Sequence, residues 1–254
     1  YQEGGGAGYT HHPFFNLDTD LSDYFLTYGE GVSESPLIKN NHAMVIPVGS
    51  LRMERIKRNL IENEDENKNA IYVVLDNIKK TSSQHYPYNG GYFSQAYRHQ
   101  VLILELLKDF PDTKFVIKTL KGNEFIYDEF LAPNICLENS PLTEVLSKAS
   151  GFILEYPSTV FQECVLTKVP IALLYNPVAL KIESTAVDIM KQRSRISGNH
   201  NEFLNIINEL IQDIKADNPM VCNQEFLNRY VLMDNTLGKI TEIFQEQILR
   251  VKHI

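Results

Sequence analysis

Apolar residues in this chain fall into short runs separated by polar segments, and these runs predict alternating strands and helices. The clearest run, residues 71–75, is continuous and rich in β-branched residues, as in a strand buried on both faces. Further strands are predicted at 114–118, 134–137, 151–155 and 170–175. In 92–110 apolar residues recur about every 3.6 positions, which predicts a helix that Pro111 ends. Other helices are predicted at 141–149, 158–166, 201–217 and 223–251.

Strands that alternate with helices in this way indicate βαβ units and therefore a parallel sheet. We predict an α/β fold with a doubly wound, Rossmann-like parallel sheet. Ligands of such sheets bind beyond the carboxyl ends of the strands, where the strand order reverses. The loops expected at this common site are 76–91, 118–124 and 155–159.

The first quarter of the chain has a pattern of its own. Its predicted elements are short strands at 23–29 and 42–48 and a helix at 51–63. A charged linker at 62–69 then precedes the first buried run, and such a change of composition marks a domain boundary. We therefore predict that residues 1–65 are the end of one α/β domain and that 66–254 form the parallel-sheet domain with its C-terminal helices.

Composition and charge narrow the possible functions. The chain has 254 residues, of which 43% are hydrophobic and 22% charged, as in a globular protein. Its 24 basic and 32 acidic residues give a net charge of −8, and the densest basic stretch is Arg52 to Arg58. A nucleic-acid-binding protein needs a basic face, so we exclude nucleic acid as a partner. The longest apolar run, 169–175, is far shorter than the about 18 residues of a membrane span.

The cysteines indicate a cellular compartment, and the first residues indicate whether the chain is part of a larger protein. Cys136, Cys164 and Cys222 lack the spacing of a metal site, and an odd number in an apolar context indicates reduced thiols. We therefore expect a reducing compartment, the cytoplasm. The chain begins at Tyr1 on a glycine-rich stretch without a signal peptide, so we expect it to be part of a larger protein.

The segment after the strand at 151–155 carries the strongest candidate site. Pro157 makes a turn, and Ser158 and Thr159 open the next helix. A serine or threonine at this position caps the helix, and the same helix start offers N–H donors to a phosphate. A plain helix cap and a phosphate site are both consistent with this pattern.

Two further features are weaker candidates. Lys118 ends a predicted strand and could pair with a phosphate, although a solvent-facing lysine explains it equally well. The stretch Gln2 to Gly8 contains Gly4, Gly5 and Gly6, which would let the backbone approach a ligand closely. It lacks the spacing of a dinucleotide-binding loop. Glu3, beside these glycines, is a candidate general base.

Other kinds of site are not supported. The seven histidines are scattered, and Asp18-Thr19-Asp20, although it spells D-x-D, precedes the first strand and is read as a turn. We expect no metal site. No G-x-S-x-G stretch is present, so a serine hydrolase is not indicated. The loop after Leu75 lacks the glycines of an NAD-binding oxidoreductase.

Taken in order, four segments resemble GT-B glycosyltransferases of bacterial surface-polysaccharide and lipopolysaccharide synthesis. They are Gln2–Gly8, Ser22–Gly29, Val48–Ser50 with Arg52, and Glu155–Pro170. The chain is more distantly similar to teichoic-acid glycerophosphotransferases and Kdo transferases. The similarity covers residues 1–180 and corresponds to the C-terminal half of such enzymes. It implies that 1–65 end the acceptor-side domain and that 66–254 bind the nucleotide donor.

The resemblance also implies roles for individual residues. Ser158 and Thr159 would hold the donor phosphate, with Lys118 and Gly49 nearby. Glu3 stands where relatives have a histidine and would accept the proton of the acceptor hydroxyl. Gly4, Gly5 and Gly6 would form an acceptor-side loop. No cofactor or bound metal is implied, because helix dipoles and basic residues stabilise the leaving phosphate in this fold.

The function predicted on this basis is transfer of a sugar from a nucleotide-activated donor to a surface glycan or lipid-linked acceptor. One alternative is a polyol-phosphate transferase of the teichoic-acid type, which differs in its donor. Another is a degenerate, non-catalytic GT-B module, which the glutamate at position 3 would favour. Location at the inner face of the plasma membrane and peripheral membrane contact stay open, as does the oligomeric state.

Overall fold

A computed structural model describes residues 6, 8–10, 19–36, 38, 42–63, 68–75, 90–119, 126–177, 180–218 and 223–251. The strands are β1 Tyr24–Thr27, β2 Met44–Pro47, β3 Ala70–Val74, β4 Phe115–Lys118, β5 Ile135–Glu138, β6 Ala149–Leu154, β7 Ile171–Leu174 and β8 Arg195–Ser197. The helices are α2 Glu30–Ser33, α3 Leu51–Glu62, α4 Gly90–Lys108, α5 Thr159–Cys164, α6 Ser184–Lys191, α7 His200–Lys215, α8 Glu225–Tyr230 and α9 Thr236–Val251.

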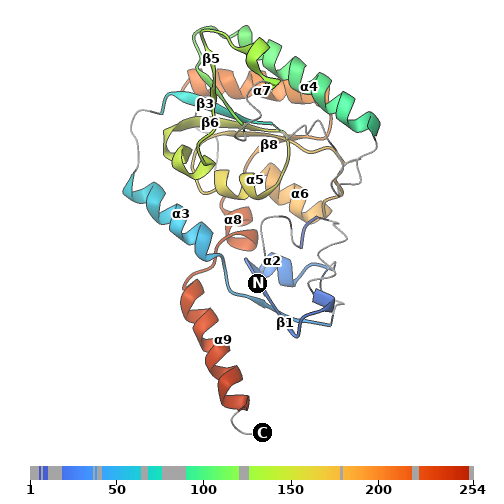
Figure 1. Cartoon of the computed structure of the whole chain (residues 1–254), viewed down its shortest axis with the longest axis vertical. Helices are drawn as coiled ribbons and strands as arrows, with labels where there is room; N and C mark the ends of the chain where they lie inside the picture. The colour runs from blue at the N-terminus through green and yellow to red at the C-terminus, as the bar shows by residue number, and fades with distance from the viewer. Residues whose placement is uncertain are drawn as a thin grey trace.

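The predicted parallel sheet is present and has six strands in the order β5-β4-β3-β6-β7-β8. Every neighbouring pair in it is parallel. The chain first adds strands on one side of β3 and then crosses to β6 on its other side. Helices cover both faces of the sheet (Figure 1), so the predicted doubly wound α/β fold is confirmed.

Alternating side chains of the strands supply two separate cores. On β3, Ile71 and Val73 pack on one face together with residues of α4 and α7. Tyr72 points to the opposite face, where the core includes residues of α5, α6 and α8. Because both faces are covered, the central strands carry apolar residues at nearly every position, which is why their runs were visible in the sequence.

Four elements of the structure differ from those predicted from the sequence. The edge strand β8 was not predicted, since it has three residues with a single large apolar side chain, Ile196. Helix α6 was not predicted either. The segment 141–149 forms two short 3₁₀ helices instead of one α-helix, because the chain must straighten to enter β6 at Ala149. The helix predicted at 223–251 is divided into α8 and α9, and Asn235 before α9 has a positive φ of 58°.

The first part of the chain forms a second, smaller sheet. β1 and β2 pair in parallel with α2 between them, and α3 follows. Their buried side chains, such as Phe25 and Met53, belong to the same core as α5 and α8. The last helix, α9, extends away from the six-stranded sheet (Figure 1). The domain boundary at residue 65 therefore stays a prediction.

Candidate functional site

The point where the strand order reverses lies between β3 and β6. Val74 and Leu154 are paired at the carboxyl ends of these strands, and the backbone N–H of Glu155 donates to the carbonyl of Val74 at 3.1 Å. A crevice at this point is where doubly wound sheets bind ligands. Of the three loops expected here, 155–159 is described completely, whereas 76–89 and 120–124 lie outside the described residues.

Ser158 and Thr159 stand directly beyond the carboxyl end of β6. Ser158 is the N-cap of α5, and its Oγ accepts a hydrogen bond from the N–H of Val160 at 3.4 Å. Both side chains are half-buried. The predicted strand, turn and capped helix are thus present, but α5 has only six residues, so its dipole is small. Their role toward a donor phosphate stays a prediction.

Glu155 is a buried carboxylate at the same point, and its sequence position alone predicts no role for it. Its side-chain Oε2 accepts a hydrogen bond of 2.6 Å from Nε2 of Gln100, which comes from α4. Tyr127 in turn donates its hydroxyl to the Gln100 carbonyl oxygen at 3.4 Å. The signal available in the sequence was an acid at the end of a buried strand. Its partner Gln100 lies 55 positions away and leaves no local pattern in the sequence.

Lys118 lies one strand away from the reversal, at the carboxyl end of β4. Its ammonium group donates to the backbone carbonyl and, at 3.1 Å, to the hydroxyl of Ser140. Burial lowers the pKa of Lys118, while the carboxylates of Glu138 and Glu144 act in the opposite direction. Two donors of the Lys118 ammonium group are therefore engaged by Ser140, and its predicted role toward a donor phosphate stays a prediction.

Gly49 has a packing role that the sequence could not show. Its φ of 99° lies in the left-handed region, and a Cβ there would stand 2.3 Å from Oγ1 of Thr236. A glycine is required because the backbone before α3 touches the chain where α9 begins. This packing explains why position 49 is a glycine, and no bound ligand is needed to explain it. The predicted contact between Gly49 and the donor stays a prediction.

The glycine-rich segment is described in part. Gly6 has a φ of 105°, and its carbonyl accepts hydrogen bonds from the N–H and Oγ1 of Thr10 at 2.9 and 2.7 Å. The other predicted residues of this segment, Glu3, Gly4 and Gly5, lie outside the described residues.

Tyr9 attaches this segment to the parallel-sheet part of the chain. Its ring is fully buried, in edge-on contact with Phe226 and Tyr230 of α8. Its carbonyl accepts a 2.8 Å hydrogen bond from the N–H of Glu183, which follows β7 on the carboxyl side of the sheet. Tyr9 is thereby held on the carboxyl side of the sheet, the side beyond which Ser158 lies.

An ion pair connects the two parts of the chain near this edge. Arg52 of α3 reaches the carboxylate of Glu163 in α5. Glu163 is 4% exposed, and burial raises its pKa while the Arg52 guanidinium lowers it. The segment around Gly49 and the segment around Ser158, which are far apart in sequence, are therefore joined by charge as well as by packing.

Two histidines stack where α4 and α7 meet. The ring centroids of His99 and His200 are 3.1 Å apart. Burial, His200 and Arg98 together lower the pKa of His99 to about 4, and burial lowers that of His200. The sequence predicts His99 to be a packed or surface residue, and its stacking on His200 agrees with packing.

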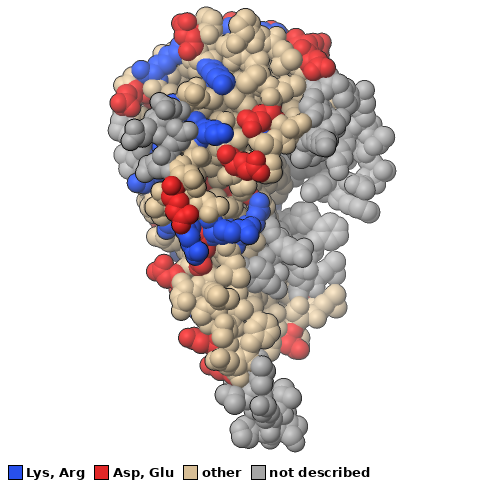
Figure 2. All heavy atoms as spheres, turned by 60° about the vertical axis from the view of Figure 1, so that its left-hand side comes forward, with Lys and Arg blue, Asp and Glu red and all other residues tan. Residues whose placement is uncertain are grey.

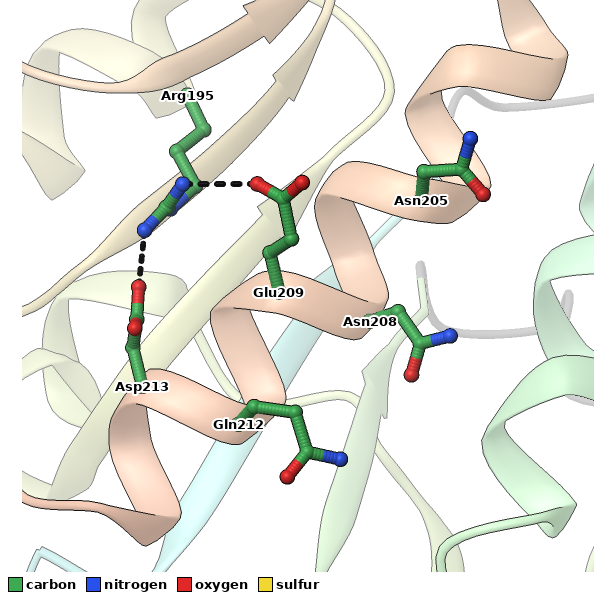
Figure 3. A pocket seen from close by; sticks show the side chains of 6 residues that line it. All are labelled: Arg195, Asn205, Asn208, Glu209, Gln212 and Asp213. Carbon is green, nitrogen blue, oxygen red and sulfur yellow. Dashed lines mark hydrogen bonds and ion pairs between the residues drawn. The ribbon is translucent and has the colours of Figure 1, made fainter.

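A hollow of about 650 Å³ lies elsewhere, on the outer side of α7. Figure 3 shows its lining, in which Arg195 donates to Glu209 at 2.9 Å and also pairs with Asp213. Arg195 begins β8, so the hollow lies near the amino ends of the strands, whereas Ser158 lies beyond their carboxyl ends. Its charged side chains Arg195, Glu209 and Asp213 pair with one another, and the hollow is wide open to solvent, so we do not assign the donor to it.

Within the described ranges, no three His, Cys, Asp or Glu side chains gather as metal ligands would. Over the same ranges, no helix combines the length and apolar character needed to cross a bilayer.

Comparison with known proteins gives distant structural likenesses. No family model and no curated protein matches the sequence. The ADP-heptose lipopolysaccharide heptosyltransferase II of E. coli is similar with a TM-score of 0.37 and 10% identity, over 65% of this chain and 53% of that chain. Two structures of the wall teichoic acid polymerase TagF have TM-scores of 0.45 at 14% and 11% identity. The first match covers 93% of this chain and 61% of that chain, and the second covers 98% and 67%.

At these sequence identities and TM-scores, the likeness is limited to the path of the backbone. The present chain spans between 53% and 67% of the length of these proteins.

Proposed function

We propose that this chain is the donor-binding half of a GT-B glycosyltransferase that moves a sugar from a nucleotide-activated donor to a surface glycan or lipid-linked acceptor. The observation that carries the proposal is the reversal of strand order between β3 and β6, with Ser158 and Thr159 directly beyond it. In doubly wound sheets this position binds nucleotides.

In this proposal the donor phosphates lie against the start of α5. The hydroxyls of Ser158 and Thr159 donate to phosphate oxygens and stabilise the charge that develops as the bond to the anomeric carbon breaks. Glu155 lies beside them as a carboxylate that accepts hydrogen bonds, the property needed to hold ribose or sugar hydroxyls. Its buried partner Gln100 would keep it oriented.

The proposed base is Glu3, which would accept the proton of the acceptor hydroxyl. The support is the position of the segment that follows it, because Tyr9 and Thr10 pack beside the carboxyl edge of the sheet. The reaction is proposed to proceed without a bound metal or cofactor, in the cytoplasm. A polyol-phosphate transfer would use the same position beyond β3 and β6 with a CDP-linked donor, and a degenerate module would bind no nucleotide.

The test is thermal unfolding of the chain with CMP, CDP, UDP, GDP and NAD in turn. A ligand at a hundred times its dissociation constant adds about 2.7 kcal/mol to the free energy of unfolding, which is visible as a rise in Tm. We expect one pyrimidine or purine nucleotide to raise Tm and NAD to leave it unchanged. A response to CDP alone would favour the polyol-phosphate alternative.

The variant Ser158→Ala/Thr159→Ala identifies the site. Loss of the cap lowers its own stability by about 1 kcal/mol, so each shift is compared with the nucleotide-free variant. The matched control is Ser184→Ala/Thr185→Ala, since this exposed pair opens α6 with the same residue types. The donor site is supported if the shift disappears only in the first variant. Absence of any shift from folded protein would contradict the proposal.

A further inference from the structure

The outer side of α7 carries a stripe of amide side chains. It consists of Asn201, Asn205, Asn208 and Gln212. These residues are four, three and four positions apart, so they share one face of the helix. All four are exposed, and none of their side chains forms a hydrogen bond with a described residue. From the first amide to the last, the helix rises about 16 Å.

Amides are an unusual choice for exposed helix positions. Asparagine is a poorer helix former than alanine, glutamate or lysine, because its side chain competes for backbone hydrogen bonds. In Figure 2, acidic and basic side chains lie interspersed over the upper part of the molecule, which holds the parallel sheet. The buried face of α7, which includes Phe203, Ile207 and Leu210, already fixes the helix in the core. The amide stripe therefore needs a reason other than helix stability.

Three of these amides line the hollow of about 650 Å³ on α7. The other lining residues are Arg195 and the two carboxylates that hold it, Glu209 and Asp213. Figure 3 shows this charged cluster along one side of the helix and the amides along the other. Each ion pair uses one terminal nitrogen of the guanidinium, which keeps further N–H donors. The hollow thus combines a fixed charged side with a row of unbonded amides.

The lining of the hollow disfavours ionic and apolar ligands. One arginine against two carboxylates leaves an excess of negative charge, which repels a phosphate or a nucleic acid. Both carboxylates are engaged by Arg195, and within the described ranges no three metal-ligating side chains gather, so a cation is not favoured either. No apolar or aromatic side chain lines the hollow, as the core of a protein interface would require.

We propose that the α7 surface, meaning the six residues that line the hollow together with Asn201, binds a neutral glycan chain. A sugar hydroxyl both donates and accepts hydrogen bonds, and an amide offers a carbonyl acceptor and N–H donors in one plane. The carboxylates add acceptors and the guanidinium adds donors. Arg195 begins β8 near the amino ends of the strands, whereas Ser158 lies beyond their carboxyl ends, so the inference does not rest on the proposed donor site.

The open shape of the hollow fits a chain better than a single small molecule. Sites for small ligands bury most of the ligand surface, whereas this hollow is wide open to solvent. Along a stripe of about 16 Å, successive sugar units meet successive amides. Because each exposed contact is weak, we expect binding to be clearest with a polymer, whose repeated units raise the effective concentration.

The test is affinity electrophoresis of the full chain in native gels. The probes are dextran, mannan and galactan, with polygalacturonate as an anionic comparison. We expect at least one neutral polymer to slow migration and polygalacturonate to have no effect. The variant Asn205→Ala/Asn208→Ala/Gln212→Ala should weaken this binding on the order of a hundredfold, from about fivefold for each lost hydrogen bond.

The matched control is Asn59→Ala/Asn228→Ala/Gln245→Ala, which replaces the same residue types at exposed helix positions outside α7. It should migrate like the parent protein. Alanine is the better helix former, so neither variant should have a lower Tm than the parent, and Tm separates loss of binding from loss of folding. Equal losses in the two variants, equal retardation by polygalacturonate, or no retardation by any of the three neutral polymers would overturn the proposal.

Discussion

Glu163 is a carboxylate inside α5 that Arg52 reaches from α3. The guanidinium compensates a charge that is otherwise buried, since Glu163 is only 4% exposed. Arg52→Ala should therefore lower the free energy of unfolding by about 1 to 2 kcal/mol at neutral pH, measured by chemical denaturation. Arg55→Ala is the control on the same helix, because Arg55 is exposed and forms no ion pair with the described residues, and should change stability by less than about 0.5 kcal/mol.

The effect of Arg52→Ala should also depend on pH. Burial raises the pKa of Glu163 above its ordinary value of 4.5. A carboxyl group whose pKa is higher in the folded than in the unfolded state binds protons more tightly in the folded state. Its ionised form therefore destabilises the fold at neutral pH, and this destabilisation disappears as the carboxyl group is protonated. The deficit of the variant should therefore shrink as the pH falls toward 4.5. A deficit that stays constant would mean that Arg52 acts by packing alone.

The stacked histidines predict sensitivity to acid. The pKa of His99 is lowered from 6.5 to about 4, so between these values the unfolded chain takes up a proton that the folded chain does not. Stability should fall as the pH decreases through this window. His99→Gln should reduce that fall, whereas His42→Gln, at an exposed position, should not. Unfolding by denaturant at neutral pH and inside the window gives the comparison.

At the scale of elements, Gly49 controls how the segment before α3 meets α9. Gly49→Ala adds a Cβ 2.3 Å from Oγ1 of Thr236 and requires a left-handed backbone, so it should destabilise the chain by about 1 to 3 kcal/mol. Gly198→Ala is the control, since its φ is outside that region and its new Cβ would have its nearest neighbours at 3.3 Å. Similar Tm values for the two variants would contradict this reading.

Elements were predictable where local chemistry decides them. The buried runs gave β3, β4, β6 and β7 to within one or two residues, and α7 was found from its apolar face. β8 was not found, because its place beside β7 depends on backbone pairing at the sheet edge. Two 3₁₀ helices stand before β6 where one α-helix was predicted, and Ala149 is already extended at the end of the second.

At the scale of the whole molecule, α9 contributes little to the described core. Leu237 and Phe244 are 62% and 60% exposed, and Thr236 supplies the contact with α3. Truncation after Gly238, which keeps Thr236, should therefore change the free energy of unfolding by less than about 1 kcal/mol. Thermal unfolding of the shortened chain tests this. A large drop in Tm would mean that α9 is packed in solution.

The candidate site shows which residues could be foreseen. Ser158 and Thr159 were recognisable because a turn, a cap and a helix start are neighbours in sequence. The role of Glu155 could not be foreseen, since its partner Gln100 reaches it from helix α4. Lys118 was chosen for its position, and its bond to Ser140 became visible only when β4 and β5 lay side by side.

The sequence by itself determined the α/β class and the parallel character of the sheet, because burial on both faces forces apolar residues at successive positions of the central strands. It also determined the helix start at Ser158, which depends on a few adjacent residues. Only the tertiary structure decided the strand order, the reversal between β3 and β6, and the contacts of Gly49 with Thr236 and of Arg52 with Glu163. These depend on how distant segments pack, and the periodicity of one segment does not specify which other segment it meets.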